Sequence, residues 1–539
     1  APEDKRVLQA AAVIGTDVPF ALLRAIADTD EEALRLSLTR LQAAELVYEA
    51  RLFPELDYAF QHALTHEVAY GTVLQDRRRA LHAAIAEAIE RLYADRLTEQ
   101  VEALAHHAVK GQLREKAVRY LRQAGARAVA RSAHREAVGF FEQALAILDE
   151  LPPTPERLAE ALDTRITLGP ALIAIKGSGA PEVETSYQRA LALVHRLGDA
   201  ARRFPALWGL WFVNYSRGKY ATARDAGEQL LDDARRGDDS GRVLEAHHAL
   251  WATLSAMGAP TAAVVHLEQG LDLYERDQHA SQAFLYGGHD PGACCRYHLA
   301  LTRWLLGHPD QALVALDGAL RLAEALKHPM TSTITLWFAA WVHYHRGERE
   351  ATASIAEQLT ALVRAHELAS WGEVEADVLL AVMRDEPLTV EGLAELYRRL
   401  VAHRSARWRH VFCLCLLAQL YARAGYAEAG TQLLASITPD DRGAFYAPEV
   451  HRIEGELALQ HATPAADDAE RRFRVAIDLA RRRGEKSLEL RAATSLARLL
   501  AGAGRRDQAR QALADVYGGF TEGFGTADLK EAKALLEVL

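Results

Sequence analysis

The sequence predicts an all-α fold, in which antiparallel helix pairs stack into a long solenoid behind a small domain with one β-hairpin. Three observations lead to this prediction. Ala, Leu, Arg and Glu, which favour helices, dominate the 539 residues. Apolar residues recur at helical spacing in one segment after another. The helical segments come in pairs that repeat along the chain, whereas β-favouring runs lie within the first 75 residues.

The first 75 residues are expected to form a domain of their own. Three short helices are predicted at residues 2–14, 19–27 and 30–45, the last with Asp30 as its N-terminal cap. Two β-favouring runs follow on either side of Pro54, over residues 46–50 and 56–60. Three helices followed by a hairpin are typical of a winged-helix domain, which we expect over residues 1–75.

Helices are predicted through the remainder of the chain. Residues 76–110 are expected to be connecting helices, and residues 111–539 a repeat array with a subdivision near 280–292. In the pair predicted at 116–131 and 134–151, the second helix has the small and aromatic residues of a tetratricopeptide (TPR) repeat: Ala137, Phe140, Phe141 and Ala144. Small residues let two helices approach closely, and an aromatic ring fills the groove beside them.

Glycines mark the ends of several first helices in these pairs. Gly218, Gly307 and Gly504 are each followed five residues later by an alanine of the next helix. Glycine suits a helix C-terminus because it adopts the left-handed conformation cheaply. A pair of amphipathic helices buries its apolar face only against neighbouring pairs, and a curved stack leaves a concave face. We expect a protein or peptide, or a small molecule, to bind on that face.

Charge and composition exclude several classes of partner. The net charge of −10 opposes nucleic acid as a main partner, because phosphate binding needs a basic surface. The four cysteines lie in apolar helical contexts without a CxxC pair, which is typical of reduced core thiols. The sequence has no run of about 18 apolar residues, so no membrane span is expected. We therefore expect a cytoplasmic protein that binds neither nucleic acid nor membrane.

Two aromatic clusters and one loop are candidates for partner binding. Trp208, Trp211 and Tyr215 share one predicted helix face, and Trp337 and Trp341 share another, because their spacings are three and four residues. These rings either fill the core between helices or line a groove for a peptide or small ligand. The loop residues His289 and Asp290 are added as candidates, because they interrupt a repeat after two glycines.

The same loop raises the question of a metal. His289 and Asp290 precede Cys294 and Cys295, and these residue types can hold zinc. Adjacent cysteines on a helix point about 100° apart, however, and rarely bind one ion. We expect no metal here, and expect Asp290 to cap the next helix with Pro291 in its first turn.

A DNA-binding role for the first domain is opposed by its charge. Residues 1–80 contain 13 acidic and 9 basic residues, and the helix that would read DNA begins with Glu31 and Glu32. Readers of the major groove need Lys or Arg there. We expect the domain to act as a structural hinge instead.

Two segments show a resemblance to a known family. Residues 58–70 (YAFQHALTHEVAY) and residues 520–533 (FTEGFGTADLKEAK) resemble parts of large bacterial adenylate/guanylate cyclase-like regulators. In that family a class III cyclase domain precedes a signal-transducing ATPase of the STAND type, and a long TPR-like region closes the chain. The resemblance implies that this chain is the C-terminal part of such a regulator.

His62 is the residue that the resemblance singles out. Gln61-His62-Ala63-Leu64 is similar to the Met-His-Asp motif of related nucleotide-switch ATPases, although Ala63 stands where that motif has Asp. In those proteins the histidine contacts the β-phosphate of ADP. The resemblance therefore implies nucleotide sensing by His62, and the alternative is a histidine that packs at a strand–helix junction.

These observations favour a non-catalytic sensor or scaffold that is coupled to a nucleotide switch outside this chain. The sequence has no GxxxxGK[ST] loop and no catalytic constellation, so we expect no catalytic residues and no cofactor here. ATP or ADP and a preceding ATPase domain are expected for the parent protein. The alternative is part of a MalT-like transcription regulator, which should carry a basic helix-turn-helix.

Overall fold

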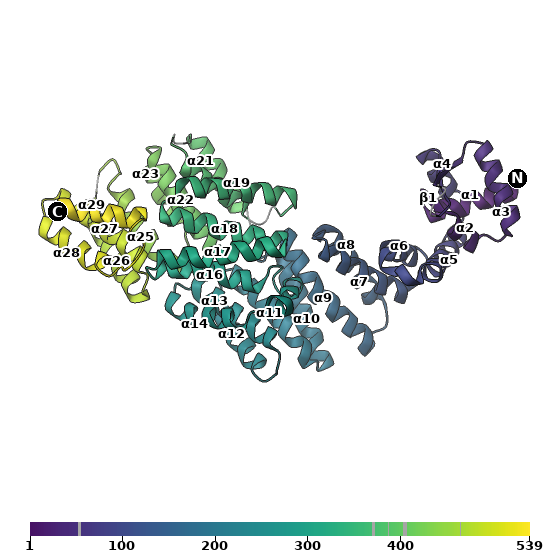
Figure 1. Cartoon of the computed structure of the whole chain (residues 1–539), viewed down its shortest axis with the longest axis horizontal. Coiled ribbons are helices and arrows are strands. Elements are labelled where there is room, and N and C mark those ends of the chain that lie inside the picture. The colour runs from purple at the N-terminus through teal and green to yellow at the C-terminus, as the bar shows by residue number, and fades with distance from the viewer. Residues whose placement is uncertain (52–54, 369–371, 386–387, 403–406, 464) are drawn as a thin grey trace. The chain divides into compact units, whose positions relative to one another are not determined.

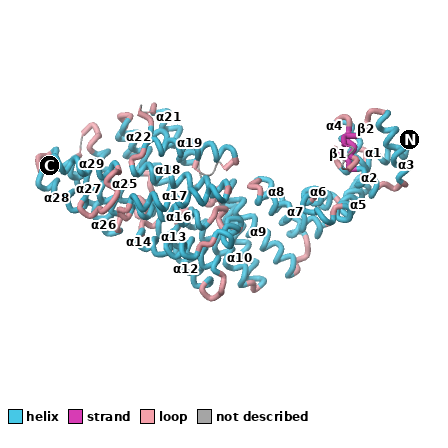
Figure 2. The backbone as a smooth tube through the Cα atoms, in the orientation of Figure 1, coloured by secondary structure: helices cyan, strands magenta, loops and turns pink. Residues whose placement is uncertain are grey.

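The computed structural model describes residues 1–51, 55–368, 372–385, 388–402, 407–463 and 465–539. These residues divide into two compact units, residues 1–164 and 165–539. Helices fill both units, and the strands of the described residues lie near the N-terminus (Figure 2). The predicted fold class, a TPR-like solenoid that follows a small domain containing strands, is confirmed. The boundaries predicted at residues 75 and 110 stay a prediction.

The small domain combines three helices with a three-stranded antiparallel sheet. Its elements are α1 (Pro2–Ile14), β1 (Asp17–Pro19), α2 (Phe20–Ile26), α3 (Glu31–Ala43), β2 (Val47–Arg51) and β3 (Asp57–Phe60). The side chain of Asp30 caps α3 by accepting a hydrogen bond from the amide of Ala33 at 2.9 Å. The expected hairpin is β2–β3, and β1 adds a third strand on the other side of β3, where Val18 pairs with Tyr58.

The rest of the first unit consists of helices. They are α4 (Ala63–Gly71), α5 (Gln75–Leu92), the short 3-10 helix η1 (Ala94–Glu99), α6 (Val101–Lys110), α7 (Arg114–Ala130), α8 (His134–Glu150) and the first part of α9 (Pro155–Lys176). Helices α5 to α8 pack on one another in chain order, and α4 packs on α1. In α8, Ala137, Phe141 and Ala144 are buried, as the repeat spacing predicts. The ring of Phe141 lies against Gly125 of α7, where a side chain would collide with it.

The second unit continues the same arrangement of paired helices (Figure 1). Its first half contains α10 (Pro181–Leu197), α11 (Ala200–Ser216), α12 (Tyr220–Ala234), α13 (Ser240–Ala256), α14 (Pro260–Leu273), α15 (Arg276–His279), η2 (Ala280–Phe284), α16 (Pro291–Leu305), α17 (Pro309–Leu326) and α18 (Pro329–Arg346). Its second half contains α19 (Arg349–Ala365), α20 (Glu373–Met383), α21 (Val390–Ala402), α22 (Arg407–Arg423), α23 (Ala427–Ala435), α24 (Pro439–Arg442), α25 (Ala447–Ala458), α26 (Ala466–Arg483), α27 (Lys486–Gly502), α28 (Arg506–Tyr517) and α29 (Ala527–Val538).

Helices distant in sequence also meet inside the second unit. The hydroxyl of Ser487 donates to the carbonyl of Trp304, 183 residues away in the chain. The amide of Phe445 donates to the carbonyl of Ala256 at 2.8 Å. Gly307 adopts a φ of +88°, and a Cβ on it would lie 3.0 Å from Cβ of Lys486. Later helices therefore cover earlier ones, so part of the inner face that we expected to be open is closed.

Each helix among the described residues is too short or too polar to cross a lipid bilayer.

The close approach of α7 and α8 gives a matched pair of stability predictions. A methyl group on Gly125 would lie 2.5 Å from Cε1 of Phe141, whereas one on Gly139 would meet nothing within 4 Å. Overpacking costs about 1–3 kcal/mol. Replacing an unhindered helical glycine by alanine gains up to about 1 kcal/mol. We expect Gly125→Ala to destabilise the first unit and Gly139→Ala to stabilise it.

Hydrogen exchange of the α7 and α8 amides in denaturant would measure both changes. Equal effects of the two substitutions would contradict the close packing of these helices.

Candidate functional site

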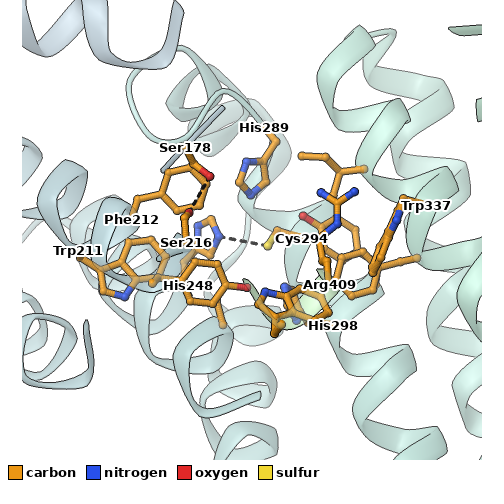
Figure 3. Close-up of a pocket in the computed structure, with 16 residues that line it drawn as sticks. Ser178, Trp211, Phe212, Ser216, His248, His289, Cys294, His298, Trp337 and Arg409 are labelled. Carbon is orange, nitrogen blue, oxygen red and sulfur yellow. Dashed lines mark hydrogen bonds between the residues drawn. The ribbon is translucent and has the colours of Figure 1, made fainter. Parts of the chain in front are cut away.

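A cavity lies inside the second unit, between α11, α13, α16, α18 and α22 (Figure 3). Its volume is about 50 Å³. About 10–15 Å³ of cavity volume holds one water molecule. The cavity therefore accommodates an ion with its waters or a ligand of a few atoms, and it is too small for a peptide.

The seven residues expected to bind a partner are all in the interior, each at most 5% exposed. Four of them line the cavity: Trp211, Tyr215, His289 and Trp337. The other three are also buried but do not line the cavity: Trp208, Asp290 and Trp341. An open concave face at these rings is thus not what the structure shows, because later helices cover them. Their role in binding stays a prediction.

One wall of the cavity is an aromatic stack on α11. The rings of Trp211 and Tyr215 stack with centroids 5.5 Å apart, as expected for neighbours at i and i+4. The indole N–H of Trp211 donates to Oγ1 of Thr253 at 2.9 Å, and that hydroxyl donates to the carbonyl of Ala249 at 2.7 Å. The stack is therefore fixed to α13 by a buried hydrogen bond.

The opposite wall combines α18 with α22 and contains residues that sequence reasoning missed. Trp408 packs against both Trp337 and Trp341, with ring centroids 5.6 and 5.4 Å away. The guanidinium of Arg409 lies 4.3 Å from the ring centroid of Trp337 and forms a buried ion pair with Glu375 at 2.8 Å. Figure 3 shows Trp337 and Arg409 across the cavity from Trp211.

A polar group of three side chains projects into the cavity between these walls. His248 of α13, His289 of the loop before α16 and Cys294 of α16 each offer one donor atom, and these atoms all lie within 4.8 Å of one another. Nε2 of His248 is 3.1 Å from Sγ of Cys294, and Nδ1 of His248 is 2.9 Å from Oε2 of Glu245. His248 and Glu245 lie far from this loop in sequence, and no local motif predicts the juxtaposition.

Burial favours the neutral forms of these groups. It lowers the pKa of His248 to about 3 and raises the pKa of the Cys294 thiol well above its usual range. Burial also raises the pKa of Glu245 well above the ordinary carboxyl value, with the nearby charge of Asp290 adding to the effect. In the contact between His248 and Glu245, burial therefore favours the neutral form of both groups.

The loop before α16 behaves as its sequence indicates. The side chain of Asp290 caps α16 by accepting from the amide of Ala293 at 2.8 Å, and Pro291 occupies the first turn. Cys295 does not join Cys294, because its thiol donates to the carbonyl of Leu267 at 3.0 Å. The two adjacent cysteines point to different neighbours, as helix geometry predicts.

His62 belongs to the first unit. It is exposed at the junction between β3 and α4, where it occupies the N-terminal cap position without a side-chain hydrogen bond to the helix. Leu64 and Val68 of α4 are also exposed, at 69% and 57%.

Comparison with known proteins finds similar proteins but does not assign the chain to a family. No family model matches the chain. It is 25% identical over 515 residues to an uncharacterized protein of Rhizobium meliloti, with 92% of this chain and 48% of that protein covered. The chain thus spans about half the length of the curated relative that it matches.

Several solved structures show distant likenesses. A Rap protein complexed with competence and sporulation factor has a TM-score of 0.42 at 10% identity, over 78% of this chain and 98% of that one. A STAND protein with a tetratricopeptide repeat sensor from Pyrococcus horikoshii has a TM-score of 0.32 at 13% identity, over 99% and 64%. Yeast Tom70 has a TM-score of 0.31 at 10% identity, over 82% and 96%.

The hydrogen bond that fixes the aromatic wall gives a second prediction. Thr253→Val removes the acceptor of the Trp211 indole and leaves a buried N–H without a partner. Such a group costs about 1–3 kcal/mol. Thr335→Val is the matched control, because the equally buried hydroxyl of Thr335 donates only to the carbonyl of Thr331 among the described residues.

We expect Thr253→Val to lower the free energy of unfolding by about 1–3 kcal/mol more than Thr335→Val does. Chemical denaturation followed by tryptophan fluorescence measures both variants. An unchanged midpoint for Thr253→Val would contradict the geometry of this wall.

Proposed function

We propose that this chain is the sensor and scaffold region of a larger signalling protein and regulates a nucleotide switch that lies outside it. The helix array would receive a ligand or a protein partner. The N-terminal domain would pass that event to a nucleotide-binding domain. The observation that carries the proposal is the surface of α4, where His62 is exposed beside two apolar side chains.

The position of His62 favours sensing over packing. A histidine that packs at a strand–helix junction would be buried or bonded to the backbone, whereas His62 is exposed and its side chain does not cap α4. Leu64 and Val68 lie four residues apart and thus on one side of the helix. Exposed apolar side chains next to a polar group are typical of a protein interface. We assign this α4 surface to the preceding nucleotide-binding domain.

The order of elements in the small domain supports a hinge of the winged-helix type. A helix, a strand, two helices and two strands follow one another from α1 to β3. A DNA-reading role for α3 finds no support in its charges, since Glu31 pairs with Arg24 at 2.7 Å and with Arg35 at 2.9 Å. Arginine side chains that are paired with acidic residues are poorly available to DNA phosphates.

The cavity supports the sensor half of the proposal. Its lining residues range from Ser178 to Arg409, so they belong to successive pairs of the array. A ligand held by several pairs would favour one relative arrangement of them. Such a ligand shifts the equilibrium between off and on states by its difference in affinity for the two. Binding in the cavity would thereby be communicated along the stack.

The experiment places this chain behind its nucleotide-binding domain and compares His62→Ala with the unaltered protein. A hydrogen bond to a charged phosphate contributes about 1.5–3 kcal/mol. We therefore expect His62→Ala to speed ADP release about 10- to 100-fold and to raise basal output. His195→Ala is the control, because His195 is an exposed histidine on α10. Release of a fluorescent ADP analogue measures the rate, and an unchanged rate in His62→Ala would remove the proposal.

The competing functions have their own assays. A MalT-like regulator would retard DNA in a gel-shift assay at moderate salt, and we expect no retardation by this chain. An enzyme with its site inside the array would turn over a substrate. We expect no ATP turnover by the purified 539-residue chain.

A further inference from the structure

We propose that His248, His289 and Cys294 bind one Zn²⁺ ion inside the cavity, and that this ion is a ligand that the array senses. The second half of this inference rests on the function proposed above, whereas the metal site stands on its own geometry. Imidazole nitrogen and thiolate sulfur are the donors that zinc prefers.

The three donor atoms are already gathered at the spacing of metal ligands. Each residue offers one atom, and the atoms lie within 4.8 Å of one another. Nε2 of His248 and Sγ of Cys294 are 3.1 Å apart. With Zn–N near 2.0 Å and Zn–S near 2.3 Å, two ligands of a tetrahedral ion lie about 3.5 Å apart. A shift of a few tenths of an ångström would therefore bring His248 and Cys294 to the spacing of two zinc ligands, and the atom of His289 lies within 4.8 Å of both.

Nδ1 of each imidazole has a hydrogen-bond partner outside the group of three ligands, which leaves Nε2 of each ring for the ion. Nδ1 of His248 lies 2.9 Å from the Glu245 carboxyl group, and Nδ1 of His289 lies 3.2 Å from the carbonyl of Gly287. Histidines that bind metals almost always bond to a carboxylate or a carbonyl through the other ring nitrogen. That hydrogen bond fixes the ring and directs the lone pair of Nε2 inwards.

Other histidine clusters among the described residues lack this arrangement. His82 and His107 face each other through their Nδ1 atoms at 2.8 Å, and so do His247 and His266. In those pairs one ring donates to the other, so their Nδ1 atoms are already used. His82 and His107 also form a possible ligand group with His106, but that group contains no sulfur.

The side chains around the three ligands favour zinc over copper, and they can balance the charge of the zinc ion. The ion carries two positive charges, and a thiolate at Cys294 with a carboxylate at Glu245 supplies two negative ones. Mononuclear copper sites with two histidines and a cysteine often add a weak axial methionine. No methionine is among the described residues that line the cavity. Three protein ligands leave a fourth position, for which the cavity has room for water.

The experiment uses the purified 539-residue chain, freed of metal with a chelator, and titrates it with Co²⁺ as a spectroscopic substitute for Zn²⁺. We expect one equivalent of Co²⁺ to produce a thiolate-to-cobalt charge-transfer band, and Zn²⁺ to abolish it by displacement. The histidine clusters without sulfur cannot produce this band. At a free Zn²⁺ concentration 100 times its Kd, the equilibrium constant for unfolding should fall about 100-fold.

Adjacent residues supply matched controls. Cys294→Ser should abolish the band, and Cys295→Ser should keep it, because the thiol of Cys295 bonds to Leu267. His248→Gln should weaken Co²⁺ binding by at least 10-fold, and His247→Gln should leave it unchanged. Circular dichroism verifies that each variant is folded. An absent band, or a band that survives Cys294→Ser, overturns the zinc site.

The signalling half has a separate readout. In the protein joined to its nucleotide-binding domain, Zn²⁺ should change the rate of ADP release, and Cys294→Ser should remove that change. A protein that binds Zn²⁺ with no change in ADP release overturns sensing and leaves the site intact. If instead His62→Ala leaves ADP release unaltered while the Co²⁺ band is present, the coupling function fails and the zinc site does not.

Discussion

The packing of each helix pair against its neighbours is the interaction on which this structure depends. An amphipathic pair has one apolar face and cannot bury it alone, so it is stable only inside the stack. In the second unit the stack also folds back, as the hydrogen bonds from Ser487 to Trp304 and from Phe445 to Ala256 show. This second layer of contacts buries tryptophans that an open solenoid would expose to water. Burying such rings is strongly favourable.

The same enclosure creates the conditions for a buried polar site. His248 and Cys294 lie between the aromatic walls on α11 and α22, and both of them and the neighbouring Glu245 are shielded from solvent and lose their hydration. Polar groups in such places are costly unless each finds a partner, and one oxygen of Glu245 has none among the described residues. A cation within reach of these groups would compensate that cost. The helices that close over the stack thus both bury its tryptophans and create the buried polar site that could bind a cation.

Sequence patterns predicted what local interactions determine. The Asp290 cap, the divergent thiols of Cys294 and Cys295, the β2–β3 hairpin and the buried face of α8 all depend on residues a few positions apart. Sequence reasoning missed β1, because a strand of three residues is too short to show an alternation of apolar and polar side chains. It also missed Trp408, Arg409 and the meeting of His248 with Cys294, 46 residues apart. Those contacts arise when distant helices converge, and no local spacing encodes them.

If helix pairs around the cavity respond together to its occupant, Zn²⁺ should protect several of them from hydrogen exchange, because exchange reports opening element by element. With Zn²⁺ bound, we expect slower exchange in α11, α13, α16 and α22 at once, with α28 and α29 unchanged. Protection limited to the few amides beside His248 and Cys294, or no protection anywhere, would contradict this expectation.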